Sequence, residues 1–210
     1  MSDITPGVEA RRAARAAGPA KLARQRQAQP NGWWGMALFV GAEATVFGSL
    51  IATYFYLDFN GGRWPPAGIK APSVVLPLIA TAVLVSTSVP MLLAARAACA
   101  GDAQRTSWLI ALAIVVQCGY LAGQVLLFAH DLHMFSPRDS AYGSIYFTML
   151  AAHHAHVLFG ILLGAAVLWR VGIGGLTNYR LTAVRTVALY WHVVNALAVL
   201  VVLTQLSPSL

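Results

Sequence analysis

The sequence has few charged residues, which make up 10% of its 210 positions. A soluble domain of ordinary composition carries about 25% charged residues, so this chain cannot cover a water-exposed surface with polar groups. Hydrophobic residues make up 58% of the chain, and the mean hydropathy is +0.66. The composition therefore excludes an ordinary soluble domain and predicts a membrane protein.

Cysteine is scarce as well, since Cys99 and Cys118 are the two in the sequence. One lies at a predicted helix end and the other within an apolar run, which disfavours a disulfide and a cysteine metal site. The chain also lacks a nucleophile elbow, a phosphate loop, a dinucleotide fingerprint and a zinc-protease motif. These absences leave no recognisable catalytic signature, and we interpret the thiols as small packing residues.

The net charge of +7 would suit a nucleic-acid partner, but six of the fourteen basic residues fall within the first 26 positions. Ahead of a first apolar run, such residues are better explained by control of membrane topology. We therefore expect no nucleic-acid partner. Residues 1–31 are Ala-rich, basic and interrupted by prolines, and they predict a disordered cytoplasmic tail in front of a transmembrane domain over residues 32–210.

Five apolar runs are long enough to cross a bilayer as helices, since about 20 residues suffice. They predict an all-α membrane protein with five transmembrane helices. The expected spans are about 33–57, 73–98, 107–129, 142–169 and 182–206. Pro77 and Pro90 fall inside the second span, where we expect bends because proline leaves a backbone carbonyl unpaired.

The basic residues between the spans are distributed unevenly, which predicts the orientation. The side facing the N-terminus collects eleven: six in the tail, with Arg96, Arg105, Arg170, Arg180 and Arg185 in the loops and helix ends. The opposite side has Arg63, Lys70 and Arg138. This asymmetry predicts a cytoplasmic N-terminus and an external C-terminus.

The first span carries one charged residue, Glu43, near its middle. A carboxylate at that depth is costly unless it is neutralised, paired or hydrated. Small residues recur every three or four positions along the same span, and such a face lets another helix approach closely. These are Ala37, Gly41, Ala44, Gly48 and Ala52.

Histidines from two other spans lie at comparable depth. At a rise of about 1.5 Å per residue, Glu43 and His192 both lie roughly 15 Å from the inner ends of their spans. By the same measure His156 lies about 20 Å deep and His153 about 24 Å. We predict that at least one of these imidazoles approaches Glu43 directly or through water. His153 and His156 share a helix face, whereas His154 points elsewhere, to lipid or to another subunit.

Three interpretations of this buried polar cluster remain open from the residues alone. The side chains could knit helices together, as polar residues do in other membrane proteins. They could serve proton movement or the recognition of a bound lipid. They could also bind a metal or haem, although zinc needs three or four converging donors and Glu43 is the carboxyl group at this depth.

Four segments carry a more specific signal: GAEATVFGSLIATYFYL (41–57), GGRWPP (61–66), YGSIYFTMLAAHHAHVLFGILL (142–163) and ALYWHVVNALAVLVV (188–202). In this order they resemble subunit III of haem-copper terminal oxidases, the cytochrome c oxidase and bacterial quinol oxidase family. The resemblance runs from about residue 33 to the C-terminus. Five spans resemble the bacterial short form, which lacks the two N-terminal helices of the seven-helix form.

The resemblance implies roles for several residues. Glu43 matches the family's buried glutamate, His153 and His156 match its H-x-x-H pair, and Trp191 with His192 matches its Y-W-H motif. It further implies a non-catalytic subunit of the bacterial cell membrane that binds no haem or copper itself. Such a subunit packs against the catalytic subunit I beside other oxidase subunits, holds phospholipid and helps to sustain proton uptake, while the complex reduces oxygen to water and translocates protons.

The sequence also departs from the family pattern, because three carboxylates are missing. Asn195 replaces the aspartate that usually follows the Y-W-H motif, Arg185 stands at an often acidic position, and Leu127 stands three positions after Gln124 where an acid is common. These departures keep an alternative open, the oxidase-III-like protein that accompanies nitric oxide reductases. The alternative from another class is a transporter or channel, which needs polar residues reaching both membrane faces.

Overall fold

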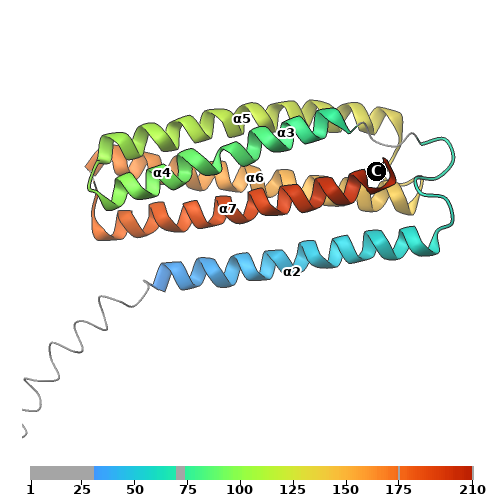
Figure 1. The fold of residues 1–210 in the computed structure, drawn as a ribbon, viewed down its shortest axis with the longest axis horizontal. Helices are drawn as coiled ribbons and strands as arrows, with labels where there is room; N and C mark the ends of the chain where they lie inside the picture. Colours follow the sequence, from blue (N-terminus) through green and yellow to red (C-terminus); the bar gives the residue numbers. More distant parts are fainter. Residues whose placement is uncertain (1–30, 70–73, 175, 210) are drawn as a thin grey trace, which may run out of the picture.

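The computed structural model describes residues 31–69, 74–174 and 176–209. Over these ranges the backbone forms helices joined by short loops, without a strand. Long helices run side by side along one axis (Figure 1), and five of the helical units are long and apolar enough to cross a membrane. The predicted all-α class with five spans is confirmed. The predicted tail lies outside the described residues, apart from Asn31.

The helices are α2 (Asn31–Asn60), α3 (Val75–Ser86), α4 (Ser88–Cys99), α5 (Ala103–Met134), α6 (Ala141–Gly174) and α7 (Asn178–Leu206), followed by the short 3-10 helix η1 (Ser207–Ser209). Most extend beyond the predicted spans, because hydropathy marks only their apolar middle. Side-chain caps fix two of the starts. Asp102 accepts a hydrogen bond from the Arg105 backbone N–H at 2.9 Å, and Thr177 accepts one from the Arg180 N–H at 3.3 Å.

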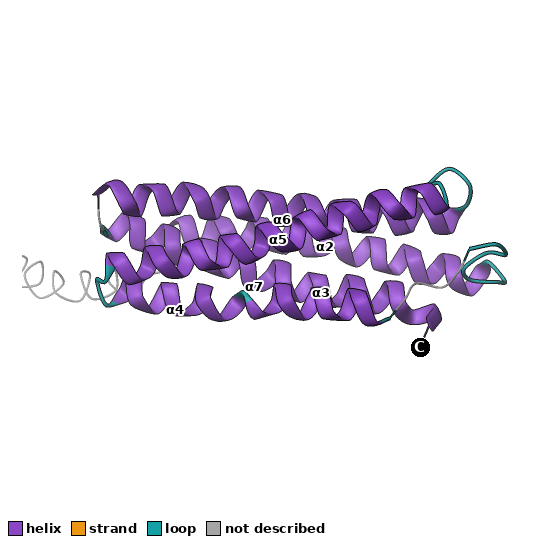
Figure 2. Ribbon diagram, turned by 90° about the horizontal axis from the view of Figure 1, so that it is seen from above, coloured by secondary structure: helices purple, strands orange, loops and turns teal. Residues whose placement is uncertain are grey.

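The second span is divided into α3 and α4 by a break at Thr87 (Figure 2). Pro90 has no N–H to donate to the carbonyl of Ser86, four residues earlier, so the helical hydrogen-bond ladder is interrupted. The Thr87 hydroxyl donates instead to the Leu84 carbonyl at 2.6 Å. The bend expected at Pro77 is not found, because this proline lies in the first turn of α3, where backbone N–H groups have no helical partner.

Helix α7 occupies the middle of the bundle, where it contacts α2, α3, α4 and α6. Helix α5 packs against α3, α4 and α6, whereas α2 packs only against α6 and α7 among the described helices. In Figure 1, α2 and α5 accordingly form opposite edges of the bundle. The core therefore lies among α3 to α7, and α2 is attached to it from one side.

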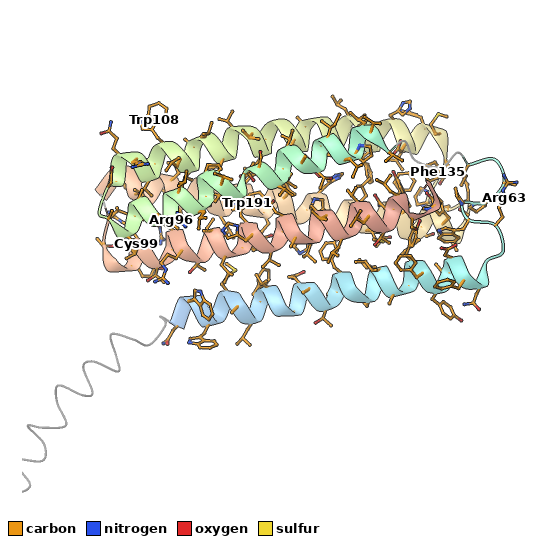
Figure 3. The ribbon with its side chains drawn as sticks, in the orientation of Figure 1. Arg63, Arg96, Cys99, Trp108, Phe135 and Trp191 are labelled. Atoms are coloured by element: carbon orange, nitrogen blue, oxygen red, sulfur yellow. The ribbon has the colours of Figure 1, made fainter. Side chains whose placement is uncertain are left out.

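The two ends of the bundle differ in composition. Arg96 and Cys99 lie at one end, where α4 leads into α5, and Arg63 and Phe135 lie at the other (Figure 3). We call the first the basic end, since Arg105 and Arg170 also lie on the helix ends found there. The second is called the C-terminal end, because α7 and η1 finish there.

Helices α6 and α7 approach each other closely at Gly160. A Cβ atom added at this glycine would lie 2.7 Å from the Trp191 ring and 2.9 Å from the Tyr190 ring. Trp191 is fully buried in the middle of the bundle (Figure 3), so its ring has no free space to move into. Gly160 therefore sets the spacing at which α6 and α7 pack.

Substitution Gly160→Ala should lower the free energy of unfolding by about 1–3 kcal/mol, because the added methyl group overpacks the α6–α7 contact. Gly123→Ala is the matched control, since a Cβ on that helical glycine meets no atom within 4 Å. The measurement is the thermal unfolding midpoint of each full-length variant in the same detergent. A Gly160→Ala protein that melts at or above the wild-type midpoint would contradict this packing.

Candidate functional site

Helix α2 attaches to α6 and α7 along one narrow seam. Phe47 and Tyr54 are both fully buried in this seam, and Met36 and Val40 pack against the core nearer the start of the helix. These residues recur at four- and seven-residue spacings, which places them on one helix face. Glu43 falls in the same row between Val40 and Phe47, so the seam holds its carboxyl group against the bundle.

The stripe of small residues on α2 lies on a different face. Gly41 and Gly48 have no atom within 4 Å of where a Cβ would lie, and Ala44 and Ala52 are exposed. No other helix approaches this face within the described chain, so the predicted close approach of another helix stays a prediction. Larger side chains such as Phe47 make the contact with α6 and α7 instead, and the small-residue face is left uncovered.

Glu43 pairs with His156 of α6, and their Oε2 and Nε2 atoms are 2.7 Å apart. The two side chains are 26% and 19% exposed, respectively. The prediction that an imidazole approaches Glu43 is confirmed, and the contact is direct. It joins residues 113 positions apart in the sequence and gives the carboxyl group of α2 a partner.

The hydrogen bonds of His156 define how many protons the pair shares. Its Nδ1 lies 2.7 Å from the carbonyl oxygen of Ala152, and a carbonyl oxygen only accepts, so Nδ1 carries a hydrogen. One further proton must lie between Nε2 and Oε2 to make the second hydrogen bond. A neutral acid facing a neutral imidazole and a carboxylate facing an imidazolium both satisfy this condition, and both give the pair no net charge.

Neighbouring side chains fix the position of His156. The Phe47 ring packs edge-on against the imidazole, with ring centroids 5.1 Å apart. The Tyr190 hydroxyl of α7 donates to the His156 carbonyl oxygen at 2.8 Å. Three helices therefore meet at this residue, and the bond to Ala152 holds the ring turned toward α2.

His153 and His154 do not contact Glu43. His153 is buried, and its Nε2 lies 3.4 Å from the Tyr120 hydroxyl of α5, while its Nδ1 has no hydrogen-bond partner among the described residues. His154 is also buried, with its ring 6.0 Å from the Phe128 ring. The expectation that His154 points to lipid or another subunit is wrong, because α5 covers it.

His192 of α7 is half-buried and forms no hydrogen bond with the described residues. Its depth matches that of Glu43, but its side chain lies on another part of the α7 surface than the seam. The predicted cluster of one carboxyl group and three imidazoles is therefore reduced to one bonded pair, Glu43 with His156.

A second polar group at the α3–α4 break was missed by the sequence reasoning. The Asn195 side-chain amide donates to the Ser88 hydroxyl at 2.7 Å, and it also approaches the Thr87 hydroxyl oxygen at 3.5 Å. The Gln117 amide of α5 donates to the same Thr87 oxygen at 3.4 Å. The signal in the sequence was the run of uncharged polar residues beside Pro90. Such residues are overlooked when only charged and imidazole side chains are considered.

The remaining motif positions have mainly packing roles in the described chain. Trp191 fills the space opposite Gly160, and Gln124 lines a cavity near the C-terminal end. Among the described residues, no three His, Cys, Asp or Glu side chains come together in a group that could hold a metal ion. The chemistry available to the described site is therefore hydrogen bonding and transfer of the proton shared by Glu43 and His156.

The assignment of a hydrogen to Nδ1 of His156 can be checked by 15N NMR of the histidine-labelled full chain in lipid. We expect the His156 signals to show a protonated Nδ1 hydrogen-bonded to a backbone carbonyl, and His156→Gln should remove them. An unprotonated Nδ1 would contradict the geometry, because the bond to Ala152 would then have no donor.

Comparison with known proteins gives one consistent result. A family model described as cytochrome c oxidase subunit III matches residues 23–206. Cytochrome c oxidase subunit 3 of Corynebacterium diphtheriae is 33% identical over 165 residues, which cover 77% of this chain and 80% of that protein. The Bacillus subtilis protein of the same name is 28% identical over 187 residues, 88% of each chain.

The protein of the same name from the bird Coturnix japonica is 29% identical over 168 residues, which cover 77% of this chain and 64% of that longer protein. The matched region includes Glu43, His156 and the other motif positions described above. Because the family model spans nearly all of the described helices, this chain belongs to the cytochrome c oxidase subunit III family.

Proposed function

We propose that this chain is the cofactor-free accessory subunit of a bacterial haem-copper oxidase that packs against the catalytic subunit I. In this proposal the haem and copper that reduce oxygen to water belong to partner subunits. Phospholipid binds to the chain, and the complex lies in the cell membrane. The observation that carries the proposal is the family match over residues 23–206, which includes the five membrane-spanning units.

Two features of the described chain support an accessory role. The hydrogen bonds of Glu43, His156 and Asn195 join helices to one another, and the described residues form no constellation of nucleophile, base and orienting group such as a catalytic site requires. The small-residue face of α2 is uncovered, and such faces allow close helix packing in membranes. A helix of subunit I is the partner that we assign to this face.

The comparisons do not favour the alternatives raised from the sequence. Each of the relatives described above carries the name cytochrome c oxidase subunit 3, and none carries the name of a nitric oxide reductase component or a transporter. The departures at Asn195, Arg185 and Leu127 therefore fall within the oxidase family. Asn195 has a packing role of its own, since its amide bonds to Ser88 at the α3–α4 break.

We assign to the Glu43–His156 pair the task of holding α2 on the bundle. The pair bridges α2 and α6 inside the apolar seam, where breaking the hydrogen bond would leave two polar groups unpaired. An unpaired buried polar group costs about 1–3 kcal/mol. A second role, transfer of a proton through the pair, is favoured by the single proton shared between Oε2 and Nε2.

Two substitutions separate the holding role from the proton role. Glu43→Gln keeps a group that can donate to His156 but has no acidic proton, so α2 should stay attached and the complex should assemble normally. Glu43→Leu removes the partner of His156 and should lower the recovery of assembled complex. Both variants are measured for assembly and for proton uptake during turnover in reconstituted vesicles. Normal assembly of Glu43→Leu would refute the holding role, and unchanged uptake in Glu43→Gln would refute proton transfer.

The accessory assignment predicts which proteins and cofactors co-purify with the chain. Affinity purification under mild detergent should recover a catalytic oxidase subunit, identified by mass spectrometry, together with haem absorption. After the chain is separated from its partners, its own spectrum should show no haem band. Haem retained by the separated chain, or recovery of another class of membrane enzyme, would overturn the assignment.

A further inference from the structure

A cavity of about 300 Å³ lies between α3, α5, α6 and α7 in the half of the bundle next to the C-terminal end. It is separate from the Glu43–His156 pair and plays no part in the proposed attachment of α2. Gly68 and Ile69 of the loop after α2 line it at one extreme, and His153 lines it at the other. The cavity therefore extends from the end of the bundle toward its middle.

The depth of the cavity follows from its lining residues. On α6 the lining runs from Tyr142 to His153, and on α5 it runs from Met134 back to Tyr120. These pairs are eleven and fourteen residues apart, which corresponds to about 16 Å and about 21 Å along a helix. The cavity therefore extends over more than half the thickness of a bilayer hydrocarbon core, which is about 30 Å.

Polar groups occur along the whole of this length. Near the end of the bundle, the Tyr146 hydroxyl donates to Asp131 Oδ2 at 2.9 Å. Gln124 lines the middle of the cavity. At the inner end the Tyr120 hydroxyl and the Nε2 atom of His153 lie 3.4 Å apart, and both residues line the cavity.

We propose that this cavity is a water-filled vestibule, in which a chain of water molecules runs from the aqueous phase at the C-terminal end to the Tyr120–His153 pair. A volume of about 300 Å³ holds about ten water molecules at roughly 30 Å³ each. Each water molecule in a cavity needs two to four polar partners to be stable. The lining residues supply polar groups from the C-terminal end of the cavity to its inner end.

The lining does not suit the other occupants of a membrane cavity. An acyl chain has no hydrogen-bonding groups and would leave the Gln124 amide and the second carboxyl oxygen of Asp131 unsatisfied. An anionic headgroup would face Asp131, and no Lys or Arg is found among the described residues that line the cavity. Water satisfies both ends of the cavity at once.

The titratable groups that line the vestibule come from two of its four helices. Helix α5 contributes Tyr120 and Asp131, and α6 contributes Tyr142, Tyr146 and His153. The lining residues of α3 and α7 are apolar or neutral, with Thr81 and Gln205 as their polar members. His153 is therefore the imidazole that water in this cavity can reach, and it gains access to protons from the bulk solvent.

Water-edited solid-state NMR of the histidine-labelled chain in lipid tests the proposal with an internal control. His153 and His154 are adjacent and both buried, but of these two histidines only His153 lines the cavity. Polarisation from water should reach the His153 ring and not the His154 ring. The assignments are made by loss of a signal in His153→Gln and His154→Gln. Equal transfer to the two rings, or none to His153, would overturn the proposal.

Cysteine labelling gives a second measurement that does not depend on His153. Leu127 lines the cavity, whereas its neighbour Leu126 is 73% exposed on the outer surface of α5 at the same depth. In a Cys99→Ala, Cys118→Ala background, Leu127→Cys and Leu126→Cys are treated in lipid nanodiscs with a positively charged methanethiosulfonate reagent. Leu127→Cys should react about tenfold faster or more, because a charged reagent enters water and avoids lipid. Equal rates would show that the cavity is dry or lipid-filled.

Discussion

Polar groups inside a membrane must find partners within the protein, and this constraint shapes the arrangement of the helices. The direct bond between Glu43 and His156 is its clearest result, because it gives the charged residue of the first span a partner and removes net charge from the pair. Apolar side chains surround the polar pair, since Val40 and Phe47 flank Glu43 along the same seam. The same hydrogen bond thus attaches α2 to the bundle and neutralises its carboxyl group.

The same constraint explains the break in the second span. Pro90 frees a carbonyl and interrupts the helix, and the hydroxyl groups of Thr87 and Ser88 then become available to Gln117 and Asn195 from two other helices. Polar residues that would be unfavourable alone are brought together where a helix is already broken. Close packing at Gly160 and Trp191 joins α6 to α7, the helices that carry His156 and Asn195.

Much of this fold could be predicted from the sequence, because span length and hydropathy depend on composition alone. The helix rise also placed Glu43 and His156 in one layer of the membrane. Depth could not decide which imidazole meets the carboxyl group, since that depends on the rotation of each helix about its own axis. His192 lies at the depth of Glu43, but the rotation of α7 about its axis directs its side chain away from the carboxyl group. The cavity could not be predicted at all, because it results from how four helices diverge.

The break at Thr87 has a mechanical consequence for the second span. Helix α4 is fixed in the core by Met91, Ala94 and Ala98, whereas α3 supplies Leu76, Pro77 and Thr81 to the wall of the cavity. The two halves of the span are therefore separate helices joined at Thr87. A small rotation of α3 about Thr87 would change the width of the cavity, while the packing around α4 would stay the same.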